Sequence, residues 1–139
     1  MRYGNTSGMW RFHGRSRLLY LTASWLLVLC IGSLLPARIK FALGTRGPAH
    51  GLIHLGAFAV MSILLMLWRK TVRQQFALAV LAVAIGVAIE IAEGSLGGNP
   101  VELGDVQLDI LGVVLAFVVL QFGIVRNLLE ILVGFRDRA

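Results

Sequence analysis

Three pairs of ionisable residues border apolar stretches of the sequence, and their types could support chemistry. In each pair the two members are three or four residues apart, so on a helix they share a face. Imidazole and carboxylate groups gathered at one point can bind a polar headgroup, ligate a divalent metal ion or transfer protons. An ionisable group at the centre of a membrane span costs roughly 2.5 to 3.5 kcal/mol on insertion scales, so each pair needs partners or a function. The pairs are His50 and His54, Glu90 and Glu93, and Asp105 and Asp109.

Four of these residues are candidates for catalysis. His54 and Glu90 lie within apolar sequence, where an ionisable side chain needs a buried partner. Asp105 has a simpler interpretation as the N-cap of a helix, and the positive end of that helix dipole could favour Asp109 one turn later. The candidate catalytic residues are therefore His54, Glu90, Asp105 and Asp109.

The other two residues are candidates for substrate binding. His50 precedes an apolar stretch, and Glu93 stands beside a glycine at the end of one. Both could also be solvated residues at a membrane surface. The sequence leaves these two interpretations open.

The composition places the chain in a membrane. Of the 139 residues, 58% are hydrophobic and 14% are charged, which is too apolar for a soluble domain to cover with polar side chains. A chain of this length has room for one compact bundle and none for a separate soluble catalytic domain. Its net charge of +6 comes from short basic clusters beside apolar runs, a pattern typical of membrane orientation and not of nucleic-acid binding.

Four apolar runs must position the ionisable pairs. Each run approaches the length that crosses ~30 Å of hydrocarbon at ~1.5 Å per residue. The sequence therefore predicts an all-α integral membrane protein, a bundle of four transmembrane helices. The runs are 18–35, 51–68, 76–91 and 106–125.

The predicted four-helix transmembrane domain covers residues 18–125 and is flanked by two charged segments. Residues 1–17 form a basic N-terminal segment. Residues 126–139 form a tail whose apolar residues recur at helical spacing, which predicts an amphipathic helix at the membrane interface or, alternatively, a continuation of the fourth span. The apolar residues of the tail are Leu128, Ile131, Leu132 and Phe135.

Small residues accompany the acidic pairs at helical spacing. Such residues mark the faces on which transmembrane helices pack closely. The pattern predicts that the carboxylates point into the bundle and not into lipid. The two stripes are Ala82, Gly86 and Glu90, and Asp109, Gly112 and Ala116.

The distribution of basic residues predicts the orientation. Ten of the thirteen Lys and Arg residues lie in the N-terminal segment, the loop after the second run and the C-terminal tail, and three lie in the loop after the first run. Because cytoplasmic loops retain Lys and Arg, both termini are predicted in the cytoplasm. The ionisable pairs would then lie at the outer leaflet.

The same ionisable residues carry a resemblance to the VanZ-like family of small bacterial membrane proteins. The family pattern has Asp-Lys-x-x-His opening one helix, Glu-x-x-Gln closing the next, and Asp-x-x-x-Asn-x-x-Gly opening the last. The resemblance covers about residues 45–120, and its spacing across two helices and a loop is more specific than any single motif. The matching residues are His54, Glu90, Asp105 and Gly112.

The chain also departs from that pattern. His50 and Gly51 replace the Asp and Lys, Glu93 replaces the Gln, and Asp109 replaces the Asn. The resemblance implies a multi-pass protein of the bacterial cytoplasmic (inner) membrane and cell envelope, with a link to glycopeptide resistance of the teicoplanin type. It implies no particular reaction.

Three functions follow as hypotheses. The first is an accessory envelope protein whose polar cluster binds a headgroup. The second is a membrane-embedded enzyme that uses a divalent metal ion or an acid and base pair on a lipid-linked phosphate. The third is a small proton-coupled transporter.

The expected partners follow from the same features. They are membrane lipids and, through the resemblance, lipid-linked cell-wall precursors or glycopeptides, with no nucleic acid. No cofactor is predicted, and a divalent metal ion remains an alternative. Four short spans would suit alternating access only in a homo-oligomer, which also stays open.

Overall fold

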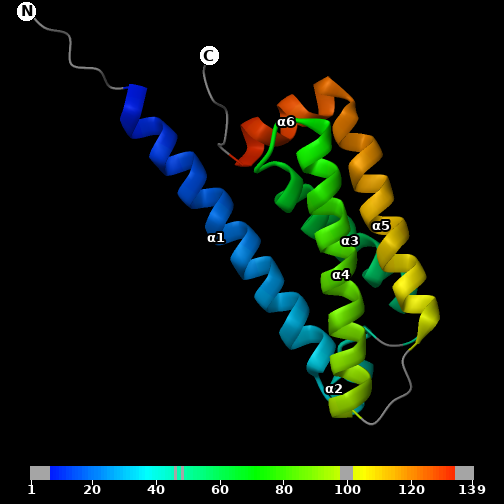
Figure 1. The fold of residues 1–139 in the computed structure, drawn as a ribbon. Helices are drawn as coiled ribbons and strands as arrows, with labels where there is room; N and C mark the ends of the chain where they lie inside the picture. The colour runs from blue at the N-terminus through cyan, green and yellow to red at the C-terminus, as the bar shows by residue number, and fades with distance from the viewer. Residues whose placement is uncertain (1–6, 46, 48, 98–101, 134–139) are drawn as a thin grey trace, which may run out of the picture.

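The computed structural model describes residues 7–45, 47, 49–97 and 102–133, and every regular element in this part of the chain is a helix. The predicted all-α fold is confirmed (Figure 1). The helices are α1 (Ser7–Leu34), α2 (Ala37–Ala42), α3 (His50–Met66), α4 (Val72–Gly97), α5 (Leu103–Gln121) and α6 (Gly123–Val133).

Three of the described helices are long and apolar enough to cross a membrane. They contain the stretches Arg15–Leu34, Val72–Leu96 and Leu103–Gln121. Helix α3 is apolar but has only 17 residues. The prediction of membrane-crossing helices is therefore supported for three of the four runs, and a membrane span at α3 stays a prediction.

The helices pack most closely between α3 and α5. A Cβ atom on Gly112 of α5 would lie 2.4 Å from the backbone oxygen of Leu55 in α3, so only glycine fits there. On α4, a Cβ atom on Gly86 would lie 2.9 Å from the ring of Phe58. The predicted small-residue stripes are confirmed as packing faces, since all their members are buried.

Helix α1 leans across α3 and α4 at an angle (Figure 1). The Trp25 indole N–H donates a hydrogen bond to the backbone oxygen of Ala57 in α3, at 3.0 Å. One turn before Trp25 on α1, the hydroxyl of Thr22 lies 3.4 Å from the indole N–H of Trp68. These hydrogen bonds fix the position of α1 against α3 and the turn after it, as polar side chains do between transmembrane helices.

The helices differ from the predicted runs in several places, and α1 already begins at Ser7, inside the predicted N-terminal segment. Helix α2 was not predicted, because its six residues are too few to show a helical period. Helix α4 continues through Gly94 to Gly97, because glycine within a helix is tolerated at a cost of about 1 kcal/mol. The fourth run breaks at Phe122, whose backbone is extended, so its last residues belong to α6.

Helix α6 is therefore a separate helix, and the alternative of a continued fourth span is wrong. The Arg126 guanidinium donates hydrogen bonds to the backbone oxygens of Arg69 and Lys70, in the turn between α3 and α4. Its position at a membrane interface stays a prediction. The ends of the two predicted flanking segments, 1–6 and 134–139, lie outside the described residues.

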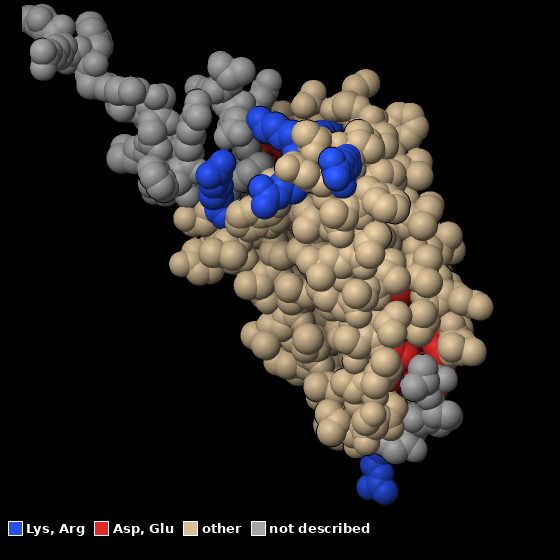
Figure 2. Space-filling view, in the orientation of Figure 1, with Lys and Arg blue, Asp and Glu red and all other residues tan. Residues whose placement is uncertain are grey.

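Charge is divided between the two ends of the bundle. Figure 2 shows most of the visible Lys and Arg side chains gathered at the end where α1 begins and α6 lies, with a basic side chain also visible at the tip of the other end, toward which most of the visible acidic side chains lie. Exposed Arg69, Lys70 and Arg73 belong to the first group, which we call the basic end. The opposite end, where α3 and α5 begin and α4 finishes, carries the ionisable pairs and is called the site end.

Candidate functional site

Two histidines of α3 face two aspartates of α5 at the site end. His50 Nε2 lies 3.0 Å from Asp105 Oδ2, and one turn further along His54 Nδ1 lies 2.9 Å from Asp109 Oδ1. His54 Nε2 is also 3.9 Å from Asp105 Oδ2. The predicted sharing of helix faces is thus observed, and the structure adds which histidine meets which aspartate.

Glycines on the facing helices allow these short side chains to meet. Besides Gly112, a Cβ on Gly51 of α3 would lie 2.8 Å from Leu108 Cδ1, so this leucine side chain would have to shift to admit one. An aspartate reaches only a short distance from its backbone, so it can contact a histidine on a neighbouring helix only where the helices approach closely. The pairing therefore depends on the glycines as well as on the polar residues.

Asp105 does not cap α5, contrary to the simpler interpretation of the sequence. Glu102 occupies the N-cap position, and Asp105 lies within the first turn, where its backbone N–H donates to the Glu102 oxygen at 2.9 Å. Its carboxylate is directed at His50 instead. Asp109 is 3% exposed. Its carboxylate likewise has a specific partner, His54.

Glu90 serves the site through the backbone of α5. The residue is 4% exposed, and its Oε1 accepts a hydrogen bond from the Glu102 N–H at 2.7 Å. This contact joins the last part of α4 to Glu102, the N-cap residue of α5. Glu90 can therefore position the start of α5, the helix that carries Asp105 and Asp109, and its candidate catalytic role stays a prediction.

Glu93 forms an ion pair with Lys40 of α2. Lys40 is buried, at 5% exposure, and sequence reasoning missed it as a site residue because it counted only as one of three basic residues in the first loop. The signal that could have found it is an acidic residue, Glu93, that needs a cation at the same end of the bundle. Glu93 is neither lipid-facing nor fully solvated.

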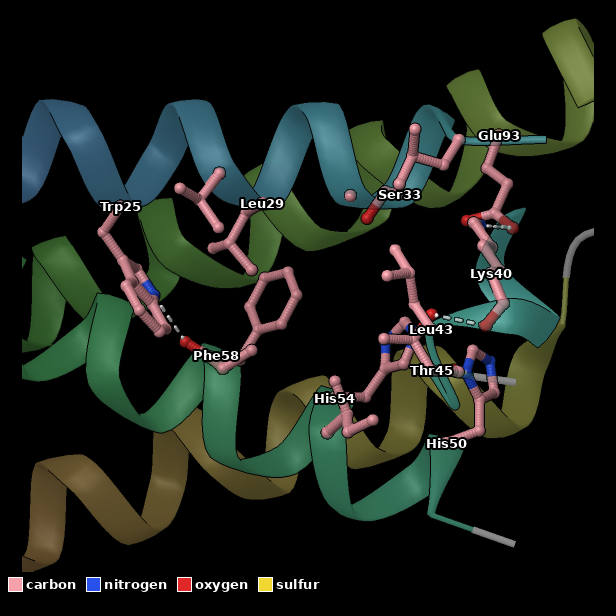
Figure 3. Close-up of a pocket in the computed structure, with 15 residues that line it drawn as sticks. Trp25, Leu29, Ser33, Lys40, Leu43, Thr45, His50, His54, Phe58 and Glu93 are labelled. Atoms are coloured by element: carbon pink, nitrogen blue, oxygen red, sulfur yellow. Dashed lines mark hydrogen bonds and ion pairs between the residues drawn. The ribbon is translucent and has the colours of Figure 1, made fainter. Parts of the chain in front are cut away.

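A pocket of about 240 Å³ lies beside the polar residues. Figure 3 shows Trp25, Leu29 and Phe58 toward one end and the polar side chains toward the other, with His54 between them. The part lined by α1 and α3 is mostly apolar, and the other end combines charged and polar side chains with Leu43. The polar lining residues are Ser33, Lys40, Thr45, His50, His54 and Glu93.

The rings of His50 and His54 meet edge to face, with centroids 4.6 Å apart. Together with Asp105 they offer three ligand atoms that lie within 4.8 Å of one another, and within the described residues this is the group suited to holding a metal ion. All six residues predicted from the sequence thus lie at one end of the bundle. Only His50, His54 and Glu93 among them line the pocket.

Comparisons with protein-family models, with curated proteins and with solved structures give no match for this chain.

Proposed function

We propose that this chain is a four-span protein of the bacterial cytoplasmic membrane that binds the polar headgroup of an amphiphile at the outer leaflet. In this proposal α3, which corresponds to the second apolar run, also crosses the membrane and brings the number of spans to four. Its 17 residues cover about 25 Å at 1.5 Å per residue, somewhat less than a ~30 Å hydrocarbon core. Contact with α1, α4 and α5 shields it from lipid over much of its length, which makes a short span tolerable.

The charge distribution supports the orientation. Exposed Arg69, Lys70 and Arg73 stand at the basic end, and cytoplasmic loops retain such residues. Helix α1 begins and α6 lies at this same end (Figure 1), so both termini would be cytoplasmic. The site end would then face outward.

The exposed surface of α6 supports an interfacial position. Ile124, Leu128 and Leu132 are all more than half exposed, whereas Arg126 and Glu130 form an ion pair at 2.9 Å. An apolar surface on a helix that crosses the end of a bundle is stabilised when it dips into the acyl boundary. This helix would lie at the cytoplasmic surface.

The pocket is the observation that carries the proposal. Its apolar part suits an acyl or prenyl chain, and its polar end offers the Lys40–Glu93 ion pair with Thr45 and the two histidines as groups for a polar headgroup. A ligand with one apolar part and one polar part matches this division. The resemblance to the VanZ-like family points to the cell envelope, where lipid-linked cell-wall precursors have this chemistry.

A membrane-embedded enzyme is the second candidate. The His54 ring is held by Asp109 through Nδ1, the arrangement in which a carboxylate orients a histidine that acts as a general base. His54 also lines the pocket. Its other nitrogen would then be the group that accepts a proton from water or substrate.

A filled pocket tests the binding proposal. In Leu29→Trp the larger ring would occupy space beside Phe58, whereas Leu27→Trp, on an exposed face of the same helix outside the pocket lining, is the matched control. The probe is a photoreactive polyprenyl phosphate in phospholipid nanodiscs. We expect crosslinking to the wild type and to Leu27→Trp, displaced by unlabelled polyprenyl phosphate, and a strong loss in Leu29→Trp.

Two results would count against this proposal. One is equal labelling of all three proteins, and the other is labelling that unlabelled polyprenyl phosphate does not displace. Release of inorganic phosphate from the bound probe would instead favour the enzyme.

A further inference from the structure

The two histidines of α3 hold their Nδ1 atoms in fixed hydrogen bonds. His50 Nδ1 lies 2.7 Å from the backbone oxygen of Thr45. A carbonyl oxygen can only accept, so this nitrogen carries the proton. His54 Nδ1 lies 2.9 Å from Asp109 Oδ1, and a carboxylate likewise accepts. In a neutral imidazole the second nitrogen, Nε2, then carries a lone pair.

Both Nε2 atoms are close to the same carboxylate oxygen. Asp105 Oδ2 is 3.0 Å from Nε2 of His50 and 3.9 Å from Nε2 of His54. Three lone-pair donors therefore converge, and they repel one another unless a positive charge lies between them. A proton on His50 would satisfy the shorter contact alone, because 3.9 Å is too long for a hydrogen bond. A metal ion would use all three atoms.

We propose that His50, His54 and Asp105 bind a divalent metal ion of the zinc class. Two imidazoles and one carboxylate are a donor set that zinc and its neighbours accept. Tetrahedral bonds of about 2.0 to 2.1 Å place ligand atoms about 3.3 Å apart, which lies between the 3.0 and 3.9 Å separations from Asp105 Oδ2, and all three ligand atoms lie within 4.8 Å of one another. Small side-chain movements would be enough to complete the site.

The surrounding contacts match what such a site requires. A metal-bound histidine commonly donates its other N–H to a backbone carbonyl or a carboxylate, which fixes the tautomer and the orientation of the ring. Thr45 and Asp109 accept these two bonds. The side chains of His54 and Asp105 are only 13% and 11% exposed, so competition from bulk water is reduced.

Three protein ligands leave a coordination position for water or another oxygen ligand. Both histidines also line the pocket, so the metal site and the pocket share a wall. The metal proposal stands on the ligand geometry and does not depend on which amphiphile the pocket binds. It differs from the candidate set named from the sequence, His54, Glu90, Asp105 and Asp109, because it includes His50 and assigns Asp109 to orienting His54.

The direct test is metal binding by the full chain purified in detergent and stripped with a chelator. We expect one Zn²⁺ per chain, and Co²⁺ in its place should give the visible absorption of a tetrahedral nitrogen and oxygen site. Asp105→Asn should lower the affinity by more than about 100-fold, the upper end for changes to orienting residues. The matched control is Glu102→Gln, which removes the same charge from an exposed side chain at the same end and should bind as the wild type does.

A second variant guards against simple misfolding. Asp105→Cys places a sulfur close to the position of the carboxylate, and a bound thiolate would add a near-ultraviolet charge-transfer band to the Co²⁺ spectrum. Its background is Cys30→Ser, since Cys30 is an exposed thiol elsewhere on the chain. The proposal fails if the wild type binds no stoichiometric metal, or if Glu102→Gln loses as much affinity as Asp105→Asn.

Discussion

The carboxylate of Glu90 accepts a hydrogen bond from the backbone N–H of Glu102, at 2.7 Å. This contact links α4 to the start of α5, and the two aspartates of the site follow on that helix. Glu90, a candidate catalytic acid in the sequence, thus also has a structural contact that can position the two aspartates.

This relationship predicts different outcomes for two substitutions of Glu90. Glu90→Gln keeps an oxygen acceptor and should cost roughly 1 kcal/mol, whereas Glu90→Leu removes the acceptor and should cost roughly 2 kcal/mol or more. The measurement is unfolding of the purified protein in mixed detergent micelles. Equal destabilisation by both substitutions would show that the hydrogen bond to Glu102 is not what matters.

The glycine contact between α3 and α5 predicts a second effect. A Cβ on Gly112 would meet the Leu55 oxygen at 2.4 Å, and backbone cannot move aside as a side chain can. Gly112→Ala should therefore destabilise the protein by roughly 1 to 3 kcal/mol, the usual cost of overpacking. It should also separate the histidines from their aspartates and weaken metal binding.

The control for this prediction lies on the same helix. A Cβ on Gly104 would meet nothing within 4 Å, so Gly104→Ala should be neutral or stabilise α5 by up to about 1 kcal/mol. If both alanine variants behave alike, the close approach of α3 and α5 does not limit the bundle.

The parts of the site that the sequence predicts are those set by local periodicity. His50 and His54 share a face because four residues make about one turn, and the small-residue stripes show which face is buried. The partner of each group is a different matter. Lys40 and Glu93 are 53 residues apart, and nothing in the helical pattern between them sets their distance in space.

The interpretation of Asp105 was wrong for a related reason. An aspartate after a glycine is a good N-cap by residue type, but the start of α5 at Leu103 depends on a hydrogen bond from Glu102 to another helix. The roles of Asp105 and Glu90 are thus decided by contacts between helices. Such contacts become visible only in three dimensions.

The buried ion pair of Lys40 and Glu93 predicts non-additive effects. Lys40→Met alone leaves a partly buried carboxylate without its cation and should destabilise the site end strongly, by up to about 3 kcal/mol. The double variant Lys40→Met, Glu93→Gln removes both charges and should recover much of that loss. A double-mutant cycle of unfolding free energies measures the coupling, and simple additivity would contradict the ion pair.

The last prediction concerns how Asp109 supports the metal ion. Its Oδ1 accepts the proton on His54 Nδ1, and an asparagine oxygen can accept the same proton. Asp109→Asn should therefore keep the ring in its orientation and tautomer, with a loss of zinc affinity of about 10-fold, whereas Asp109→Leu removes the acceptor and should lose about 100-fold. Co²⁺ titrations should rank the affinities of the two variants in the same order, because Asp109 changes the orientation of the His54 ring and does not itself contact the metal ion.

The contrast with Asp105 separates an orienting residue from a ligand. Asp105→Asn should weaken binding more than either substitution of Asp109, since it removes a charged oxygen from the ion itself. If Asp109→Asn is instead the most damaging of the three, Asp109 is the ligand and His54 must bind through Nδ1. The hydrogen bond between His54 Nδ1 and Asp109 would then have to break when the metal enters, and the proton of the neutral His54 ring would move to Nε2.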